Sequence, residues 1–142
     1  MVLVDSSVWI ESAKRNGDLA CKVGLEALLE EYEAALCGPV RLEVLGGARP
    51  ADRQRLEDYF ALLPYYPVEE SDWGTAVRNS WSLRDVGLTI PWNDILVATL
   101  SLRLKCRVYA RDTHFAALQR ILDIDLYEPG PGGKYSPGPR IG

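Results

Sequence analysis

The chain opens with a short apolar run that ends abruptly at a carboxylate. Met1 to Val4 form a run of the kind found in strands that are buried on both faces of a sheet. Asp5 follows, and Ser6 and Ser7 then begin a second apolar segment that favours a helix started by a hydroxyl cap. We therefore expect Asp5 in a strand-to-helix turn. Because ligands of open parallel sheets collect beyond the carboxyl ends of the strands, this turn predicts a functional site.

Strand-like and helix-like segments alternate along the rest of the chain. Further strands are predicted at 34–37, 65–68, 106–110 and 124–127, and helices at 17–32, 38–47, 50–63, 71–86, 91–105 and 113–122. Pro67 predicts an edge position for the strand at 65–68. The alternation predicts a three-layer α/β/α domain with right-handed crossovers, built on a central, mostly parallel sheet of four to five strands.

Length and composition favour one domain. With 142 residues and 47% apolar content, the chain can bury a sizeable core. We expect a single domain at 1–128, followed by a Pro/Gly-rich tail at 129–142. No apolar stretch approaches the roughly 20 residues of a membrane span, and the N-terminus lacks a secretory signal pattern, so a cytoplasmic location is expected.

Cysteine content and net charge argue against several kinds of site. Cys21, Cys37 and Cys106 are odd in number and widely spaced, which favours reduced core thiols over a disulfide framework or a zinc site. The net charge of −4 argues against a broad basic surface for nucleic acid. An acidic site can still meet a phosphate through a bound divalent cation.

Tryptophans at helical spacing mark the segment 71–86. Trp73, Val77 and Trp81 share one side of the predicted helix, and we expect them in the core or in a dimer interface rather than stacked on bases. Trp92 could stack on a base, but core or dimer packing is favoured for it as well.

Four carboxylates are predicted to meet at one rim of the sheet. Asp5 and Asp112 each follow a strand, and Glu43 and Asp94 lie in the early turns of helices that begin at the same edge. Taken singly, each acid reads as a helix cap, a first-turn acid or a solvated residue. Together they repel one another, by about 4 kcal/mol per pair at about 4 Å in an effective dielectric of about 20. Protonation or a divalent cation relieves this repulsion.

The ligand type indicates which cation would bind. Oxygen ligands favour Mg²⁺ or Mn²⁺ over zinc. A carboxylate-bound cation of this kind is suited to phosphodiester hydrolysis, which then needs no serine, cysteine or histidine nucleophile.

The acidic segments resemble the four motifs of PIN-domain ribonucleases, and the length is similar to that of VapC-type toxins of toxin-antitoxin pairs. The resemblance runs to about Tyr127 and rests on VLVDSSVWIE, VRLEVLGGA, PWNDILVATLSL and VYARDTHF. It implies a Mg²⁺- or Mn²⁺-dependent endoribonuclease that forms a homodimer, cuts RNA and is inhibited by a small antitoxin protein. The catalytic and metal-binding acids would be Asp5, Glu43, Asp94 and Asp112.

The resemblance also assigns supporting residues. The small polar position after the first acid falls on Ser6 and Ser7, and Ser7 is the better candidate to orient a carboxylate. The chain departs from the family pattern at Ala110, where the fourth motif often has Thr or Ser, and at His114, where some members have a further acid. These departures concern the position of the fourth acid and the binding of a second metal ion.

Cations near the fourth motif are candidate substrate contacts. His114, the only histidine, would contact phosphate or pair with a carboxylate, unless it is a surface residue at a helix start. Arg111, together with Arg41 and Arg107, would supply a basic rim for RNA, although isolated arginines are usually solvated.

Three alternatives remain at the level of sequence. In an aspartyl-phosphate phosphotransferase Asp5 would be the nucleophile, but Ser7 stands where such enzymes need a second acid. A nucleotide-binding switch lacks its phosphate loop, G-x-x-x-x-G-K-[ST]. A catalytically inactive PIN-like RNA-binding or interaction module is indicated only by Ala110. The RNA that is cut and the identity of the antitoxin are not encoded in these motifs.

Overall fold

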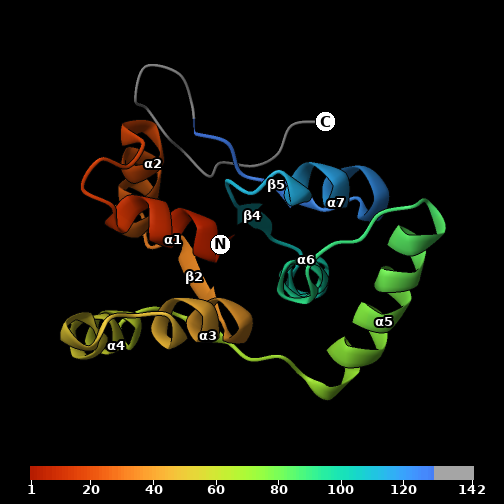
Figure 1. Cartoon of the computed structure of the whole chain (residues 1–142), viewed down its shortest axis with the longest axis horizontal. Coiled ribbons are helices and arrows are strands. Elements are labelled where there is room, and N and C mark those ends of the chain that lie inside the picture. Colours follow the sequence, from red (N-terminus) through yellow and green to blue (C-terminus); the bar gives the residue numbers. More distant parts are fainter. Residues whose placement is uncertain (130–142) are drawn as a thin grey trace.

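A computed structural model describes residues 1–129 as a five-stranded parallel sheet flanked by helices (Figure 1). In chain order the elements are β1 (Val2–Val4), α1 (Ser6–Ala13), α2 (Leu19–Glu30), β2 (Ala34–Cys37), α3 (Gly38–Gly46), a 3₁₀ turn η1 (Pro50–Asp52), α4 (Arg53–Phe60), β3 (Tyr65–Tyr66), α5 (Glu70–Asp85), α6 (Trp92–Leu104), β4 (Arg107–Tyr109), α7 (His114–Leu122) and β5 (Asp125–Leu126). The predicted α/β fold class is therefore confirmed.

β1 is the central strand. The strand order is β3-β2-β1-β4-β5, and Leu3 pairs with Ala35 on one side and Val108 on the other. All residues of β1 are at most 1% exposed, as expected for an apolar strand with neighbours on both edges. β3 lies at the edge of the sheet, as Pro67 predicted, and it ends at Tyr66 because proline has no N–H group for the ladder.

The path of the chain reverses at β1. It moves outward from β1 to β2 and β3, and then returns past β1 to β4 and β5. With right-handed crossovers, this reversal places α1 to α4 on one side of the sheet and α5 to α7 on the other. Figure 1 shows these two groups, red to yellow and green to blue, on either side of the strands. The carboxyl ends of β1 and β4 flank the switch point, where open α/β sheets bind their ligands.

The tryptophan stripe of α5 is not part of the core. Trp73, Val77 and Trp81 are 51%, 48% and 61% exposed, so of the two expected places, the core and a dimer interface, the core is excluded for all three. The reason is that α5 buries Ser80 and Leu83 instead, while the stripe borders a groove beside α6. The helical periodicity identified the residues that share one face of α5, but not which part of the molecule covers that face. Trp92 is 63% exposed, so of its two favoured places, the core and a dimer interface, the core is excluded as well.

The cysteines are free thiols, as predicted. Cys21 and Cys37 are buried and Cys106 is half-buried. Burial raises the pKa of the Cys37 thiol to about 12, which keeps it protonated and unreactive at neutral pH.

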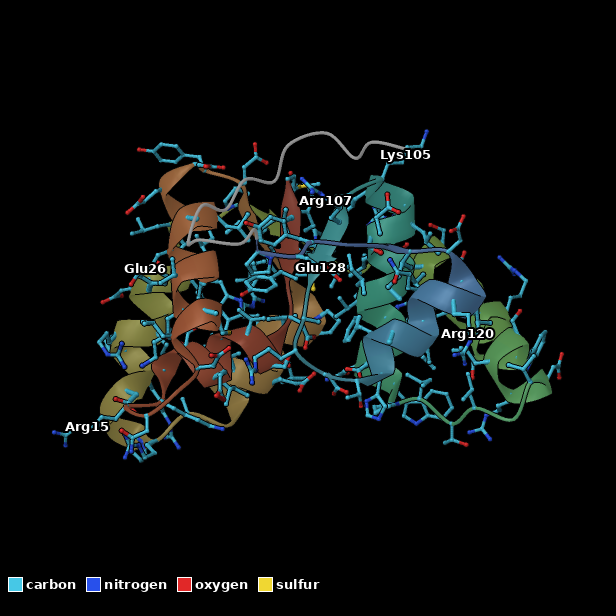
Figure 2. The ribbon with its side chains drawn as sticks, turned by 90° about the horizontal axis from the view of Figure 1, so that it is seen from above. Arg15, Glu26, Lys105, Arg107, Arg120 and Glu128 are labelled. Carbon is cyan, nitrogen blue, oxygen red and sulfur yellow. The ribbon has the colours of Figure 1, made fainter. Side chains whose placement is uncertain are left out.

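Charged side chains lie on the outer surface of both helical groups. Figure 2 shows Arg15 and Glu26 on the side of α1 and α2, and Lys105 and Arg120 on the side of α6 and α7. Within residues 1–129, no helix has the length and apolar character needed to cross a membrane. The predicted tail at 129–142 lies, except for its first residue, outside the described residues, and the domain boundary at 128 stays a prediction.

Candidate active site

Asp5 lies directly after β1 and is 2% exposed. Its Oδ2 accepts hydrogen bonds from the backbone N–H of Ser7 at 3.1 Å and from the Ser7 hydroxyl at 2.6 Å. The contact expected between Ser7 and a carboxylate is thus present. Oδ1 of Asp5 is buried and has no hydrogen-bond partner among residues 1–129. A buried carboxylate oxygen without a donor is costly, so this atom marks a place for a ligand.

Ser7 also connects the two strands that border the switch point. Its hydroxyl oxygen accepts a hydrogen bond from the backbone N–H of Arg111 at 3.0 Å, and the backbone N–H of Asp5 donates to the Tyr109 carbonyl at 2.8 Å. These contacts tie the start of α1 to the segment after β4. One small side chain therefore positions both loops that carry acids of the site.

Glu43 reaches the same rim from α3. Its Oε2 accepts a hydrogen bond from the Ser6 hydroxyl at 3.0 Å, and its Oε1 accepts one from the Asn93 side-chain amide at 2.9 Å. Asn93 was not among the residues singled out from the sequence. The available signal was its position in the first turn of α6, directly before Asp94.

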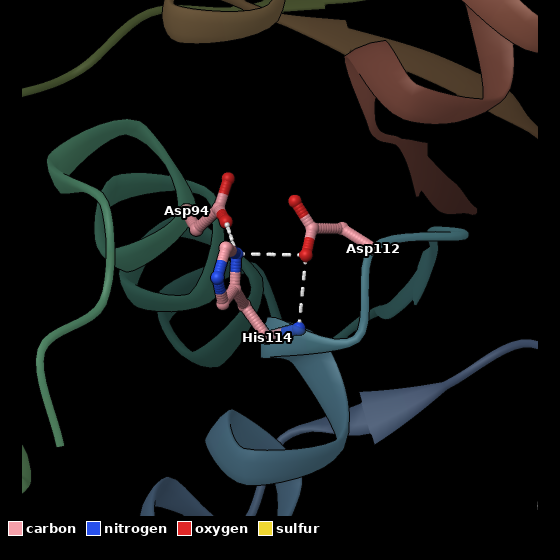
Figure 3. Close-up of side chains that lie close together, drawn as sticks. All are labelled: Asp94, Asp112 and His114. Carbon is pink, nitrogen blue, oxygen red and sulfur yellow. Dashed lines mark hydrogen bonds and ion pairs between the residues drawn. The ribbon is translucent and has the colours of Figure 1, made fainter.

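Asp94, Asp112 and His114 form a contiguous cluster (Figure 3). Nδ1 of His114 lies 3.0 Å from Oδ2 of Asp94 and 2.7 Å from Oδ1 of Asp112. The backbone N–H of His114 also donates to Oδ1 of Asp112 at 2.9 Å. One of the expectations for His114 is confirmed: it pairs with carboxylates, those of Asp94 and Asp112.

Burial and mutual repulsion change the proton affinity of these acids. Burial, together with the charges of Asp5 and Asp112, raises the pKa of Asp94, the contact with His114 opposes the shift, and the resulting pKa is about 6. Burial likewise raises the pKa of Asp5, against the hydrogen bonds from Ser7, and the charge of Glu43 adds to the increase. The structure thus brings Asp5, Glu43, Asp94 and Asp112 close enough to interact.

The only side-chain cation that pairs with these acids among residues 1–129 is His114, whose charge is titratable. Partial burial lowers its pKa, but Asp94 and Asp112 outweigh this effect, so the pKa lies above its ordinary value. The guanidinium of Arg111 points to other partners, Asp18 at 2.7 Å and Glu11 at 4.0 Å, and only its backbone N–H contacts the site.

The donor set fits a divalent cation. One ligand atom from each of Asp94, Asp112 and His114 lies within 4.8 Å of the others, and Asp5 adds its unpartnered oxygen from the neighbouring loop. Carboxylate oxygens suit Mg²⁺ and Mn²⁺, and imidazole nitrogen suits transition metals. Asp5, Asp94 and Asp112 have oxygens that would hold the ion, whereas both oxygens of Glu43 already accept hydrogen bonds, from Ser6 and Asn93.

A parallel sheet that reverses at β1, with an acidic rim at the switch point, defines a PIN-like α/β protein. Ribonuclease VapC11 from Mycobacterium tuberculosis and VapC ribonuclease Mb1587 from Mycobacterium bovis are each 33% identical to the chain over 129 residues, which is 87% of the chain and 96% of the relative. The chain belongs to the VapC ribonuclease family. No protein-family model matches it.

Solved structures share the fold. FitAcB from Neisseria gonorrhoeae has a TM-score of 0.71 at 18% identity, over 90% of this chain and 97% of that one. VapBC2 from Rickettsia felis, bound to a promoter DNA fragment, has a TM-score of 0.72 at 17% identity, over 89% and 97%. A toxin-antitoxin complex from Klebsiella pneumoniae has a TM-score of 0.65 at 15% identity, over 97% and 98%.

Proposed function

We propose that the chain is a metal-dependent endoribonuclease, using Mg²⁺ or Mn²⁺, and the toxin of a toxin-antitoxin pair. Its family membership supports RNA cleavage. The observation that carries the metal dependence is the buried, unpartnered Oδ1 of Asp5, beside acids that raise one another's pKa. Without a bound cation this arrangement is electrostatically unfavourable.

The four acids have distinct environments in the proposed site. Asp5 and Asp94 are buried and form its main part, and Asp112 completes it from the segment after β4. Glu43 is half-buried, and its two oxygens accept hydrogen bonds from Ser6 and Asn93, which supports a role for its carboxylate as the proton acceptor from an attacking water.

A bound divalent cation would polarise a phosphoryl oxygen of RNA and lower the pKa of a nearby water. The chain's own groups then position and deprotonate that water, and no covalent intermediate with the protein is required. The catalytically inactive alternative is not favoured, because the family consists of ribonucleases and all four acids are present at one rim.

An apolar groove supports the proposal of an antitoxin partner. It lies between α1, α2, α3 and α4, has a volume of about 650 Å³, and is lined by Trp9, Ile10, Leu25, Leu29, Leu56 and Tyr59. Its charged lining residues include Arg15 and the ion pairs of Asp52 with Arg49 and Arg55. The apolar face of an amphipathic helix complements such a surface. An Ile10→Arg variant should keep RNA cleavage and escape inhibition by the antitoxin.

Homodimerisation is supported by the exposed stripe of α5. Trp73, Val77 and Trp81, with Trp92, border a groove of about 390 Å³ between α5 and α6. Exposed apolar patches of this kind mark interaction surfaces. Light scattering should give a dimer for the wild type and a monomer for Trp81→Glu. A cytoplasmic location, where RNA and an antitoxin are accessible, completes the proposal.

Cleavage of a labelled pool of cellular RNAs by protein freed of any partner tests the function. We expect cutting with Mg²⁺ or Mn²⁺, none with EDTA, and none by Asp5→Asn or Asp94→Asn. Asp85→Asn, an exposed acid at the end of α5, is the matched control and should cut like the wild type. Equal cutting by all variants would identify a contaminant, and no metal binding at all would leave the inactive module as the remaining interpretation.

A further inference from the structure

His114 stands where the carboxylates of Asp94 and Asp112 come together (Figure 3). A single atom, Nδ1, contacts one oxygen of each acid, at 3.0 Å and 2.7 Å. The imidazole is therefore not a peripheral neighbour of the acidic rim. It belongs to the same set of donor atoms.

The spacing of these atoms suits a shared ion. Adjacent ligands of an octahedral ion at about 2.1 Å lie about 3 Å apart. Both separations from Nδ1 are of this size, and the three ligand atoms lie within 4.8 Å of one another. In the metal-free chain these contacts are hydrogen-bonded ion pairs, so the proton that Nδ1 shares with the two acids leaves to solvent when an ion binds. The site is also accessible, because the side chain of His114 is 40% exposed.

Residues on both sides of His114 in the sequence fix the backbone that carries its imidazole ring. His114 is the first residue of α7, and its backbone N–H is bonded to Asp112. The next residue, Phe115, is 1% exposed and anchors the helix in the core, together with the fully buried Leu118. A ligand on a packed helix keeps its position better than one on a free loop.

Imidazole changes which ion such a site selects. Mg²⁺ prefers oxygen ligands and retains its waters, whereas an imidazole nitrogen is a good ligand for first-row transition ions. Mn²⁺ accepts both carboxylate oxygen and imidazole nitrogen. We infer that His114 is a metal ligand of this site and makes it select Mn²⁺ over Mg²⁺, an inference that rests on the proposed function.

Metal binding, measured without RNA, tests the inference. The free Mn²⁺ signal in electron paramagnetic resonance and calorimetric Mg²⁺ titration give the two dissociation constants for wild type, His114→Gln and Arg120→Gln. The last is a matched control, an exposed residue in the final turn of the same helix. We expect His114→Gln to weaken Mn²⁺ binding about tenfold or more while Mg²⁺ binding changes less than about threefold.

A spectroscopic signature separates ligation from a purely structural role. Electron spin-echo spectra of bound Mn²⁺ should contain an imidazole ¹⁴N coupling in the wild type and in Arg120→Gln, and none in His114→Gln. Absence of this coupling from the wild type overturns the inference. Equal losses of Mn²⁺ and Mg²⁺ affinity in His114→Gln also overturn it, since they mean that His114 only supports the local structure.

An Asp94→Asn variant distinguishes failure of the inference from failure of the proposed function. If Asp94→Asn loses both ions while His114→Gln binds them like the wild type, the metal site stands and only the role of His114 is wrong. If Asp94→Asn binds both ions like the wild type, the acidic rim is not the metal site and the proposed function fails with the inference.

Discussion

Asp72 of α5 and Asp94 of α6 are both buried acids, but their electrostatic environments are opposite. Asp72 is 2% exposed, and its two oxygens accept hydrogen bonds from Arg103 at 2.8 and 3.0 Å. Asp94 is 6% exposed and lies among other acids with a histidine as its only ion-pair partner in residues 1–129. Burial alone would raise both pKa values. The hydrogen bond from Arg103 brings that of Asp72 below its usual range, whereas that of Asp94 rises to about 6.

The difference separates a structural carboxylate from one that needs a ligand. Asp72 has a permanent counter-charge and also caps α5, by accepting a hydrogen bond from the backbone N–H of Glu69 at 2.8 Å. Its interactions are complete in the folded chain. Those of Asp94 become complete only when a cation or a proton arrives, so burial without a permanent counter-charge is the better indicator of function.

The largest expected effect is the loss of catalysis in Asp94→Asn. Removing a carboxylate from the metal site should lower the RNA cleavage rate about a thousandfold or more, equivalent to about 4 kcal/mol of transition-state stabilisation. Thermal unfolding of the metal-free variant should occur at the same or a higher temperature, because repulsion is relieved. Wild-type cleavage by this variant would refute the contrast with Asp72.

Arg103→Met should have the opposite effects to Asp94→Asn: it should lower stability and leave RNA cleavage unchanged. It leaves Asp72 buried without its counter-charge and should lower the free energy of unfolding by about 3 kcal/mol, measured by urea denaturation. RNA cleavage, assayed well below the unfolding temperature, should be unchanged. Adding Asp72→Asn should restore part of the lost stability, and a loss below about 1 kcal/mol in Arg103→Met would show that the pair is not structural.

Ser7→Ala tests how far positioning contributes to the site. It removes the hydroxyl that donates to Asp5 and accepts from the Arg111 backbone, so cleavage and metal affinity should each fall about tenfold to a hundredfold. Ser12→Ala, in the same helix but remote from the acids, is the control. If both variants behave alike, Ser7 does not position the site.

Asp94 and Asp72 should make opposite contributions to the pH dependence of stability. The folded chain holds the Asp94 proton more tightly than the unfolded chain, so its contribution favours folding at low pH and is lost as the pH rises through about 6. The raised pKa of His114 acts in the same direction: its contribution is complete below the ordinary value of about 6.5 and is lost at higher pH. The contribution of Asp72 is complete above its ordinary pKa of about 4 and is lost only as the pH falls below it.

Metal-free protein should therefore unfold at a temperature about 3 °C lower at pH 7 than at pH 5. The stabilisation by added Mn²⁺ should be larger at pH 7, where the acids are ionised. Differential scanning calorimetry of wild type and Asp94→Asn measures both effects. If Asp94→Asn has the same pH dependence of unfolding as the wild type, groups other than Asp94 cause that dependence.

The smallest effect is expected for Arg111→Gln. The guanidinium pairs with Asp18 at the surface, and such pairs contribute about 0 to 1 kcal/mol. Stability and the KM for RNA should both change little, because only the backbone of this residue contacts the site. A large rise in KM, with stability unchanged, would instead support the substrate contact predicted for Arg111.

The sequence predicted much of this architecture because local signals carry it. An apolar run that stops at Asp5, and a proline before Asp94, locate the ends of elements where acids can meet. For the tryptophan stripe of α5 the sequence left the core and a dimer interface open for a physical reason: periodicity reports which residues share a face, whereas burial depends on a neighbour elsewhere in the chain. The position of Asn93 beside Asp94 was the only local signal for this residue, and its hydrogen bond to Glu43, 50 residues away, could not be predicted from it.

The sequence by itself determined the order of the elements, the parallel sheet and the position of each acid at the ends of strands or the starts of helices. Only the tertiary structure decided which acids have a counter-charge. Asp72 and Arg103 are 31 residues apart, and Asp94 and His114 are 20 apart. Backbone propensity acts over a few neighbouring residues, whereas charge pairing and desolvation depend on which side chains the completed fold brings together.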